Sequence, residues 1–99
     1  MQNYSNNLRE LRKAKGMRQI EVAQLLGHLN SDRISDWETG KGMPSVVNLF
    51  KLSTIYGVTT EKLYQDLITL TAKEIEEKRT SGLSEWESRM KTTKMVETQ

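Results

Sequence analysis

The chain has 99 residues, of which 35% are hydrophobic and 28% are charged, so it is long enough for one small domain with much solvated surface. It contains no cysteine, which excludes disulfides and thiolate metal sites, and its single histidine, His28, cannot build a zinc site and is expected to be exposed in a turn. The formal net charge of +2 is weak evidence for a nucleic-acid partner, so such a function has to be argued from particular residues.

Residues 8–18, at the first predicted helix and just after it, carry five basic residues against one acidic residue, Glu10. The basic residues are Arg9, Arg12, Lys13, Lys15 and Arg18. Such a cluster can follow the phosphates of a nucleic acid, whose neutralisation releases counterions. Without other evidence, a solvated helix face is the simpler explanation of the same charges.

Four glycines, Gly16, Gly27, Gly40 and Gly57, each follow the last residue of an apolar run with helical spacing. Because many helices end through a left-handed residue, which glycine adopts without a Cβ penalty, each glycine predicts a helix end. Four ends predict four helices, and a fifth follows the last of them. No run alternates with period two over the length of a strand, so residues 1–67 are expected to form a compact all-α domain.

Residues 19–38 are expected to form two short helices joined by a turn at Gly27. Helices of this length gain their stability from packing an apolar face, so the pair needs the flanking helices as a scaffold. The inward stripes are Ile20, Ala23 and Leu26 on one helix, and Ile34 and Trp37 on the other. The candidate start signals are Asn30 or Ser31 for the third helix, Pro44 and Ser45 for the fourth, and Thr59 or Thr60 for the fifth.

The sequence resembles the phage-repressor and Cro type of helix-turn-helix domain, the XRE family, over about two thirds of its length. The resemblance rests on an ordered set of positions: Leu11-Arg12, Gly16, Gln19, Val22-Ala23, Leu26-Gly27, Ile34-Ser35, Trp37-Glu38, Gly40, Pro44, Leu49, Leu52, Gly57-Val58 and Leu63. Two features depart from the family pattern. Arg18 replaces the usual capping Ser or Thr, and the turn over residues 27–30 is one residue longer than usual.

The resemblance implies a five-helix, lambda-repressor-like DNA-binding domain, and beyond it we expect residues 68–99 to form a partly helical C-terminal extension. In such domains the second helix of the pair lies in the major groove and the first crosses the DNA backbone. The residues that this arrangement places at the DNA are Arg18, Gln19, Asn30, Ser31, Asp32, Arg33, Asp36 and Lys41. It also implies an internal ion pair between Arg12 and Glu38, so Arg12 is not expected to contact DNA.

The expected roles of these residues differ. Arg33 can take guanine O6 and N7 together, or a phosphate, and Lys41 is expected to contact a phosphate. Gln19 is expected either to touch a phosphate or to brace the recognition helix. Each aspartate has two explanations. Asp32 can read cytosine N4 or favour the positive end of the helix dipole, and Asp36 can read cytosine or pair with Arg33. The neighbouring Trp37 belongs to the inward stripe and is expected to pack in the core.

Residues 68–99 lie outside the resemblance and carry six basic and six acidic residues. The fifth helix is expected to continue past Asp66, because two apolar stripes run on from it. These stripes are Leu63, Leu67 and Leu70, and Tyr64, Ile68 and Ile75. They predict either a dimer interface or packing back onto the domain's own core. Beyond Ser81-Gly82, the segment 84–87 fits a capping box and predicts a short helix with Trp86, and residues 91–99 predict a frayed end.

No combination of acids, His28 and a nucleophile resembles a catalytic site, and no glycine-rich phosphate loop follows a strand, so we expect neither an enzyme nor a cofactor. No apolar stretch is long enough to span a membrane and residues 1–5 lack the features of a signal peptide, so we expect a cytoplasmic protein. The predicted function is sequence-specific binding of double-stranded DNA, as a homodimeric repressor on a palindromic operator. The alternatives are a protein-interaction module, and an antitoxin whose residues 68–99 bind a protein partner.

Overall fold

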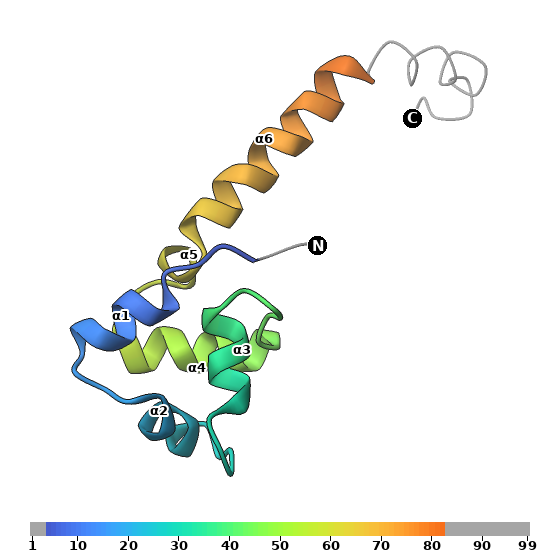
Figure 1. Cartoon of the computed structure of the whole chain (residues 1–99). Coiled ribbons are helices and arrows are strands. Elements are labelled where there is room, and N and C mark those ends of the chain that lie inside the picture. Colours follow the sequence, from blue (N-terminus) through green and yellow to red (C-terminus); the bar gives the residue numbers. More distant parts are fainter. Residues whose placement is uncertain (1–3, 83–99) are drawn as a thin grey trace, which may run out of the picture. The chain divides into compact units, whose positions relative to one another are not determined.

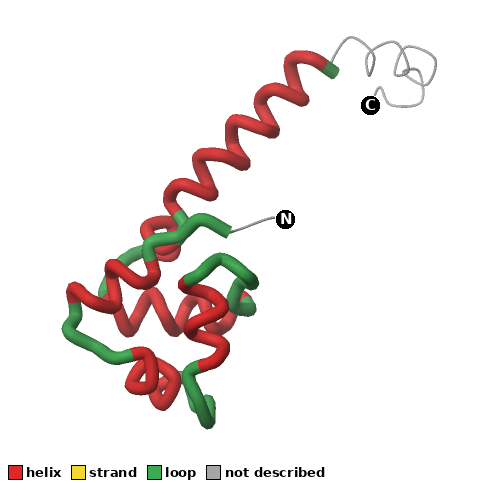
Figure 2. Tube along the Cα trace, in the orientation of Figure 1, coloured by secondary structure: helices red, strands yellow, loops and turns green. Residues whose placement is uncertain are grey.

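The fold is known from a computed structural model, which describes residues 4–82 (Figure 1). This described part contains six helices and no strand, and its loops connect the helices as Figure 2 shows. The helices are α1 (Leu8–Ala14), α2 (Gln19–Leu25), α3 (Asp32–Glu38), α4 (Val46–Tyr56), α5 (Thr60–Leu63) and α6 (Gln65–Ser81). The sequence-based predictions for segments 84–87 and 91–99 lie outside the described residues. The all-α fold predicted from the sequence is confirmed.

The chain divides into two compact units, Met1–Ile68 and Thr69–Gln99. The core of the first unit is apolar: α3 contacts α1 and α2, and α4 contacts α5. Its most deeply buried residues come from all five of its first helices and are Leu8, Val22, Ala23, Ile34, Leu52 and Leu63, none more than 2% exposed. Ala23 has no exposed surface, in agreement with its expected place on the inward stripe.

The four predicted helix ends are confirmed at Gly16, Gly27, Gly40 and Gly57. All four glycines have left-handed backbone conformations, with φ between 68° and 82°. No other described residue has a positive φ. A Cβ would be strained at each of these positions whatever the space around it, which explains why glycine stands there.

The helix starts resolve the alternatives left open by the sequence. Ser45 caps α4 by accepting a hydrogen bond from the Asn48 N–H, and Thr59 caps α5 in the same way, each at 3.2 Å. At α3, Ser31 occupies the capping position but its side chain makes no capping bond. Instead, Asn30 Oδ1 accepts the Asp32 N–H at 3.0 Å. Asn30 therefore fixes the start of the helix after the turn.

The expected continuation of the fifth helix is wrong: α5 ends at Leu63, and a separate helix, α6, begins at Gln65. The residue between them, Tyr64, has φ −129° and ψ 40°, outside the helical region. The physical reason lies in the N-terminal segment. The Asn7 side chain donates to the Lys62 carbonyl and its backbone N–H donates to the Leu63 carbonyl, both at 2.9 Å. Two carbonyls that a continuous helix needs are thus taken by Asn7.

Part of the predicted apolar stripes is used inside the first unit. Tyr64 is 3% exposed and Leu67 packs against the core, so for these residues the alternative of packing on the domain's own core holds. Further along α6, Leu70 and Ile75 are 58% and 56% exposed. No helix in the described range is both long and apolar enough to cross a membrane.

Candidate nucleic-acid interface

Helix α3 is fixed from inside by a hydrogen-bonded group of three side chains. Arg12 of α1 contacts Glu38, the last residue of α3, through two bonds, Nε to Oε2 at 2.6 Å and Nη2 to Oε1 at 3.0 Å. The side chains are only 11% and 3% exposed, and the hydrogen bond to Glu38 raises the pKa of Arg12 further. Arg12 Nη1 also donates to the Met17 carbonyl at 2.9 Å. The structure therefore brings Arg12 and Glu38 together and leaves Arg12 turned inward.

Gln19, the first residue of α2, completes this group. Its Nε2 donates to Glu38 Oε1 at 3.0 Å, so one carboxylate accepts hydrogen bonds from two other elements. Of the two roles expected for Gln19, the structure shows the brace between α2 and α3. Ile34 is 1% and Trp37 5% exposed. The inner flank of α3, formed by Ile34, Trp37 and Glu38, therefore packs in the core and makes the Glu38 bonds.

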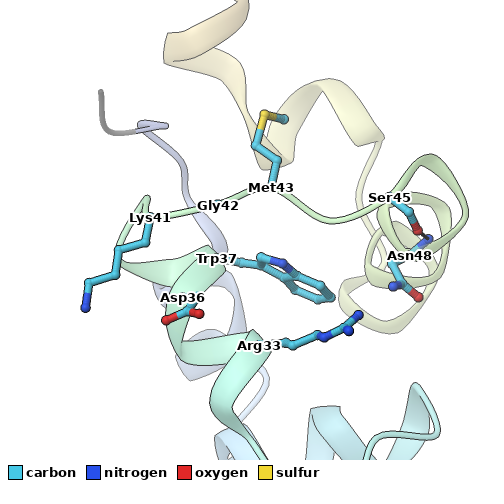
Figure 3. Close-up of a pocket in the computed structure, with 8 residues that line it drawn as sticks. All are labelled: Arg33, Asp36, Trp37, Lys41, Gly42, Met43, Ser45 and Asn48. Atoms are coloured by element: carbon cyan, nitrogen blue, oxygen red, sulfur yellow. Dashed lines mark hydrogen bonds between the residues drawn. The ribbon is translucent and has the colours of Figure 1, made fainter. Parts of the chain in front are cut away.

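The outer flank of α3 carries the predicted base-reading residues. Asp32, Arg33 and Asp36 are exposed, and Ser31 is half-buried. A hollow of about 320 Å³ lies beside this flank, between α3, the loop that follows it and the start of α4. Figure 3 shows the side chains that line it. The lining residues are Arg33, Asp36, Trp37, Lys41, Gly42, Met43, Ser45 and Asn48. Arg33 and Lys41 thus lie at one surface feature although they belong to different segments.

Arg33 and Asp36 do not pair, so the explanation of Asp36 as a partner that holds Arg33 is wrong. The ion pairs found within residues 4–82 are Arg12–Glu38, Arg18–Glu21 and Arg79–Glu76. In Figure 3 the Arg33 side chain extends toward Asn48 of α4, whereas Asp36 points to the other side, toward Lys41. Although positions three apart on a helix are neighbours, the two side chains point away from each other, and Arg33 is left free to meet a ligand.

Arg18 stands just before α2 and its side chain is 75% exposed. A guanidinium carries only donors, so it cannot accept a helix N–H as a Ser or Thr would. Half of the usual capping arrangement remains, because Glu21 Oε1 accepts the Arg18 N–H at 2.7 Å. This bond to the Arg18 backbone is the main cause that lowers the pKa of Glu21. The charged end of Arg18 has only a 3.7 Å contact with Glu21 and faces solvent.

Two residues of this surface were missed or misjudged from the sequence. Asn48 lines the hollow although no motif singled it out; the available signal was its place three residues after the capping Ser45. His28 was expected to be exposed, and this is wrong: it is half-buried, with its ring 5.9 Å from that of Trp37 at 67°. The turn folds the His28 ring inward against the tryptophan. Its Nδ1 is buried without a hydrogen-bond partner.

A family model described as Helix-turn-helix (HTH_3) matches residues 8–63, which include α1 to α5. The chain belongs to this helix-turn-helix family. Its helix-turn-helix pair is α2 and α3, and the family is one of DNA-binding transcription regulators. The predicted resemblance to the XRE type is confirmed.

One curated relative of this helix-turn-helix chain is the HTH-type transcriptional activator BcrR of Enterococcus faecalis, which is 34% identical over 73 residues. The match covers 72% of the present chain and 35% of the relative, so the chain spans about a third of the relative's length. No solved structure matches the chain.

Proposed function

We propose that this chain binds duplex DNA sequence-specifically and regulates transcription, with α3 in the major groove. The observation that carries the proposal is the division of α3 into two flanks. The inner flank is held by Ile34, Trp37 and the Glu38 bonds, whereas the outer flank presents Arg33 beside Lys41. Neither of these two basic side chains has an ion-pair or hydrogen-bond partner among the described residues.

The proposal assigns different tasks to the exposed residues. Arg33 reads guanine through O6 and N7, since a forked guanidinium matches those two acceptors. Lys41, from the loop after α3, and Arg18, before α2, contact phosphates on either side of the helix. Asp36, which lines the same hollow, accepts a hydrogen bond from a cytosine N4 amine. Asn30 Oδ1 is occupied in capping α3, so only its amide nitrogen is available for DNA.

At the level of the whole protein, we propose a homodimer on a palindromic operator. In dimeric helix-turn-helix proteins the two recognition helices lie about 34 Å apart, one turn of duplex. Residues 1–67 would form the DNA-binding domain and residues 68–99 the extension. Repression, as predicted from the sequence, stays a prediction, because the relative carries the name of an activator.

A second candidate function is supported by the exposed Leu70 and Ile75 on α6, which present apolar surface in a segment with balanced charge. Such surface fits a protein partner of the extension, as in an antitoxin. This role adds to DNA binding by α3 and does not replace it.

Selection of duplexes from a random pool tests the proposed function directly. We expect the full chain to enrich one motif, with two inverted half-sites whose centres lie about 10 base pairs apart. A variant with both Arg33→Ala and Lys41→Ala is the matched control and should enrich nothing, because both side chains are exposed and their loss leaves the core intact. Failure of the unaltered chain to enrich any sequence would contradict the proposal.

A further inference from the structure

Leu29 has an apolar side chain that does not pack against the rest of the fold. It lies in the turn between α2 and α3 and is 99% exposed, whereas Val46, the next most exposed large hydrophobic residue of the described range, is 64% exposed. Turns of this kind are usually built from small or polar residues. In the free protein, therefore, Leu29 contributes nothing to burial.

The backbone that carries Leu29 is held on both sides. Before it, the His28 N–H donates to the Ala23 carbonyl at 2.8 Å, and the His28 ring packs against Trp37. After it, the Asn30 side chain accepts the Asp32 N–H. The turn thus presents Leu29 outward between fixed neighbours, three residues before α3 begins.

This position determines what Leu29 can meet. In helix-turn-helix complexes the N-terminal residues of the recognition helix contact the base edges, and Leu29 stands three residues before α3 begins. Base edges in the major groove present hydrogen-bonding groups and one apolar group, the C5-methyl of thymine. Because the leucine side chain has no polar atoms, in the groove it can distinguish bases only through this methyl group.

We propose that Leu29 reads a thymine at the edge of each half-site by packing on its C5-methyl group. The inference rests on the proposed function, because it requires α3 to enter the major groove. It adds a specificity contact outside the helix, made by a residue of the turn that precedes α3.

The test uses the duplex obtained from the random-pool selection, with each thymine replaced in turn by deoxyuridine, which lacks only the methyl group. For the full chain, we expect one replacement per half-site to weaken binding about three- to fivefold, as for the loss of one buried methyl-sized contact. The Leu29→Ala variant should bind the thymine and deoxyuridine duplexes with equal affinity. Both affinities should be lower than the affinity of the unaltered chain for the thymine duplex.

Leu25→Ala is the matched control, because Leu25 is also exposed, at 61%, but lies on α2. This variant should keep the preference for thymine. Two results would overturn the inference: the full chain binds every deoxyuridine duplex as tightly as the thymine duplex, or the preference for the methyl group survives in Leu29→Ala. In either case the proposed function still stands if binding depends on Arg33. If no duplex is bound at all, both fail together.

Discussion

Arg12, Glu38 and Gln19 link three helices at a point where both ionic side chains are largely removed from water. A pair of this kind is a weak source of stability as a whole, but the removal of one partner is costly because the other charge stays buried. Its structural value here is geometric. It ties the C-terminal end of α3 to α1 and α2, and so holds in place the helix that carries the exposed Arg33.

The replacement Arg12→Met is expected to lower the free energy of unfolding by about 3–5 kcal/mol, because it leaves the Glu38 carboxylate with Gln19 as its remaining side-chain donor. Urea denaturation measures the loss. Arg9→Met, on the exposed face of the same helix, is the control and should change stability by less than about 0.5 kcal/mol. Similar values for the two variants would show that the pair is not the link between α1 and α3.

The buried hydroxyls of Tyr56 and Tyr64 should make the folded protein less stable at alkaline pH. Burial raises the pKa of each to about 12, and the charge of Glu38 adds to the effect on Tyr56. An unfolded tyrosine has a pKa of about 10, so the unfolded state loses its protons first. The stability carried by the neutral hydroxyls is therefore complete below pH 10 and falls as the pH rises toward 12, by about 2–3 kcal/mol for each tyrosine.

The double variant Tyr56→Phe with Tyr64→Phe should remove this alkaline loss. Neither buried hydroxyl has a hydrogen-bond partner, so phenylalanine fits without breaking a bond. Urea midpoints at pH 8 and pH 11 give the comparison. A midpoint that falls equally in both proteins between these pH values would contradict the assignment.

At the scale of the elements, Arg18 leaves α2 without a side-chain cap and instead provides a positive charge for a phosphate contact. A serine there could accept the Glu21 N–H and complete the capping box that Glu21 already half forms. Arg18→Ser is therefore expected to raise the free energy of unfolding by about 0.5–1 kcal/mol and to weaken DNA binding through the loss of a phosphate contact.

The control for this replacement is Arg18→Ala, which loses the guanidinium without gaining a cap. It should bind DNA as weakly as the serine variant but show no gain in stability. Thermal unfolding and duplex titration separate the two effects. Full DNA affinity in both variants would remove Arg18 from the interface.

Local signals were enough to predict most elements. The four glycine ends follow from backbone sterics alone, and the caps at Ser45 and Thr59 follow from side chains within three residues. The break at Tyr64 could not be predicted in this way, because it depends on Asn7, 55 residues from Lys62 in sequence. No periodicity within the helix itself signals such a competitor for its carbonyls.

The candidate surface also depends on long-range contacts that local sequence signals do not reveal. The Arg12–Glu38 contact was implied by the family pattern, whereas the place of Asn48 beside Arg33 depends on how α4 packs. His28 was misjudged because the burial of a turn residue is decided by its tertiary neighbour, here Trp37. Leu29 drew no interpretation from the sequence, and its near-complete exposure became visible only when the turn was placed.

At the scale of the whole molecule, the modest net charge requires that attraction to DNA be local. Of the five basic residues in segment 8–18, Arg12 is withdrawn into the core, which leaves four for solvent. Together with Arg33 of α3 and Lys41 of the loop after it, these can neutralise several phosphates although the net charge is small. Binding should therefore depend strongly on salt, since each neutralised phosphate releases counterions.

The most direct test of the central claim is the salt dependence of duplex binding, measured for the full chain and for Lys41→Ala and Arg33→Ala. We predict a steep fall of affinity with salt. Lys41→Ala should weaken all sequences alike and reduce the slope by about one per protomer, while Arg33→Ala should cost about 1–3 kcal/mol and relax base preference at one position. Undetectable or salt-insensitive binding, or identical effects of the two variants on every sequence, would contradict the account.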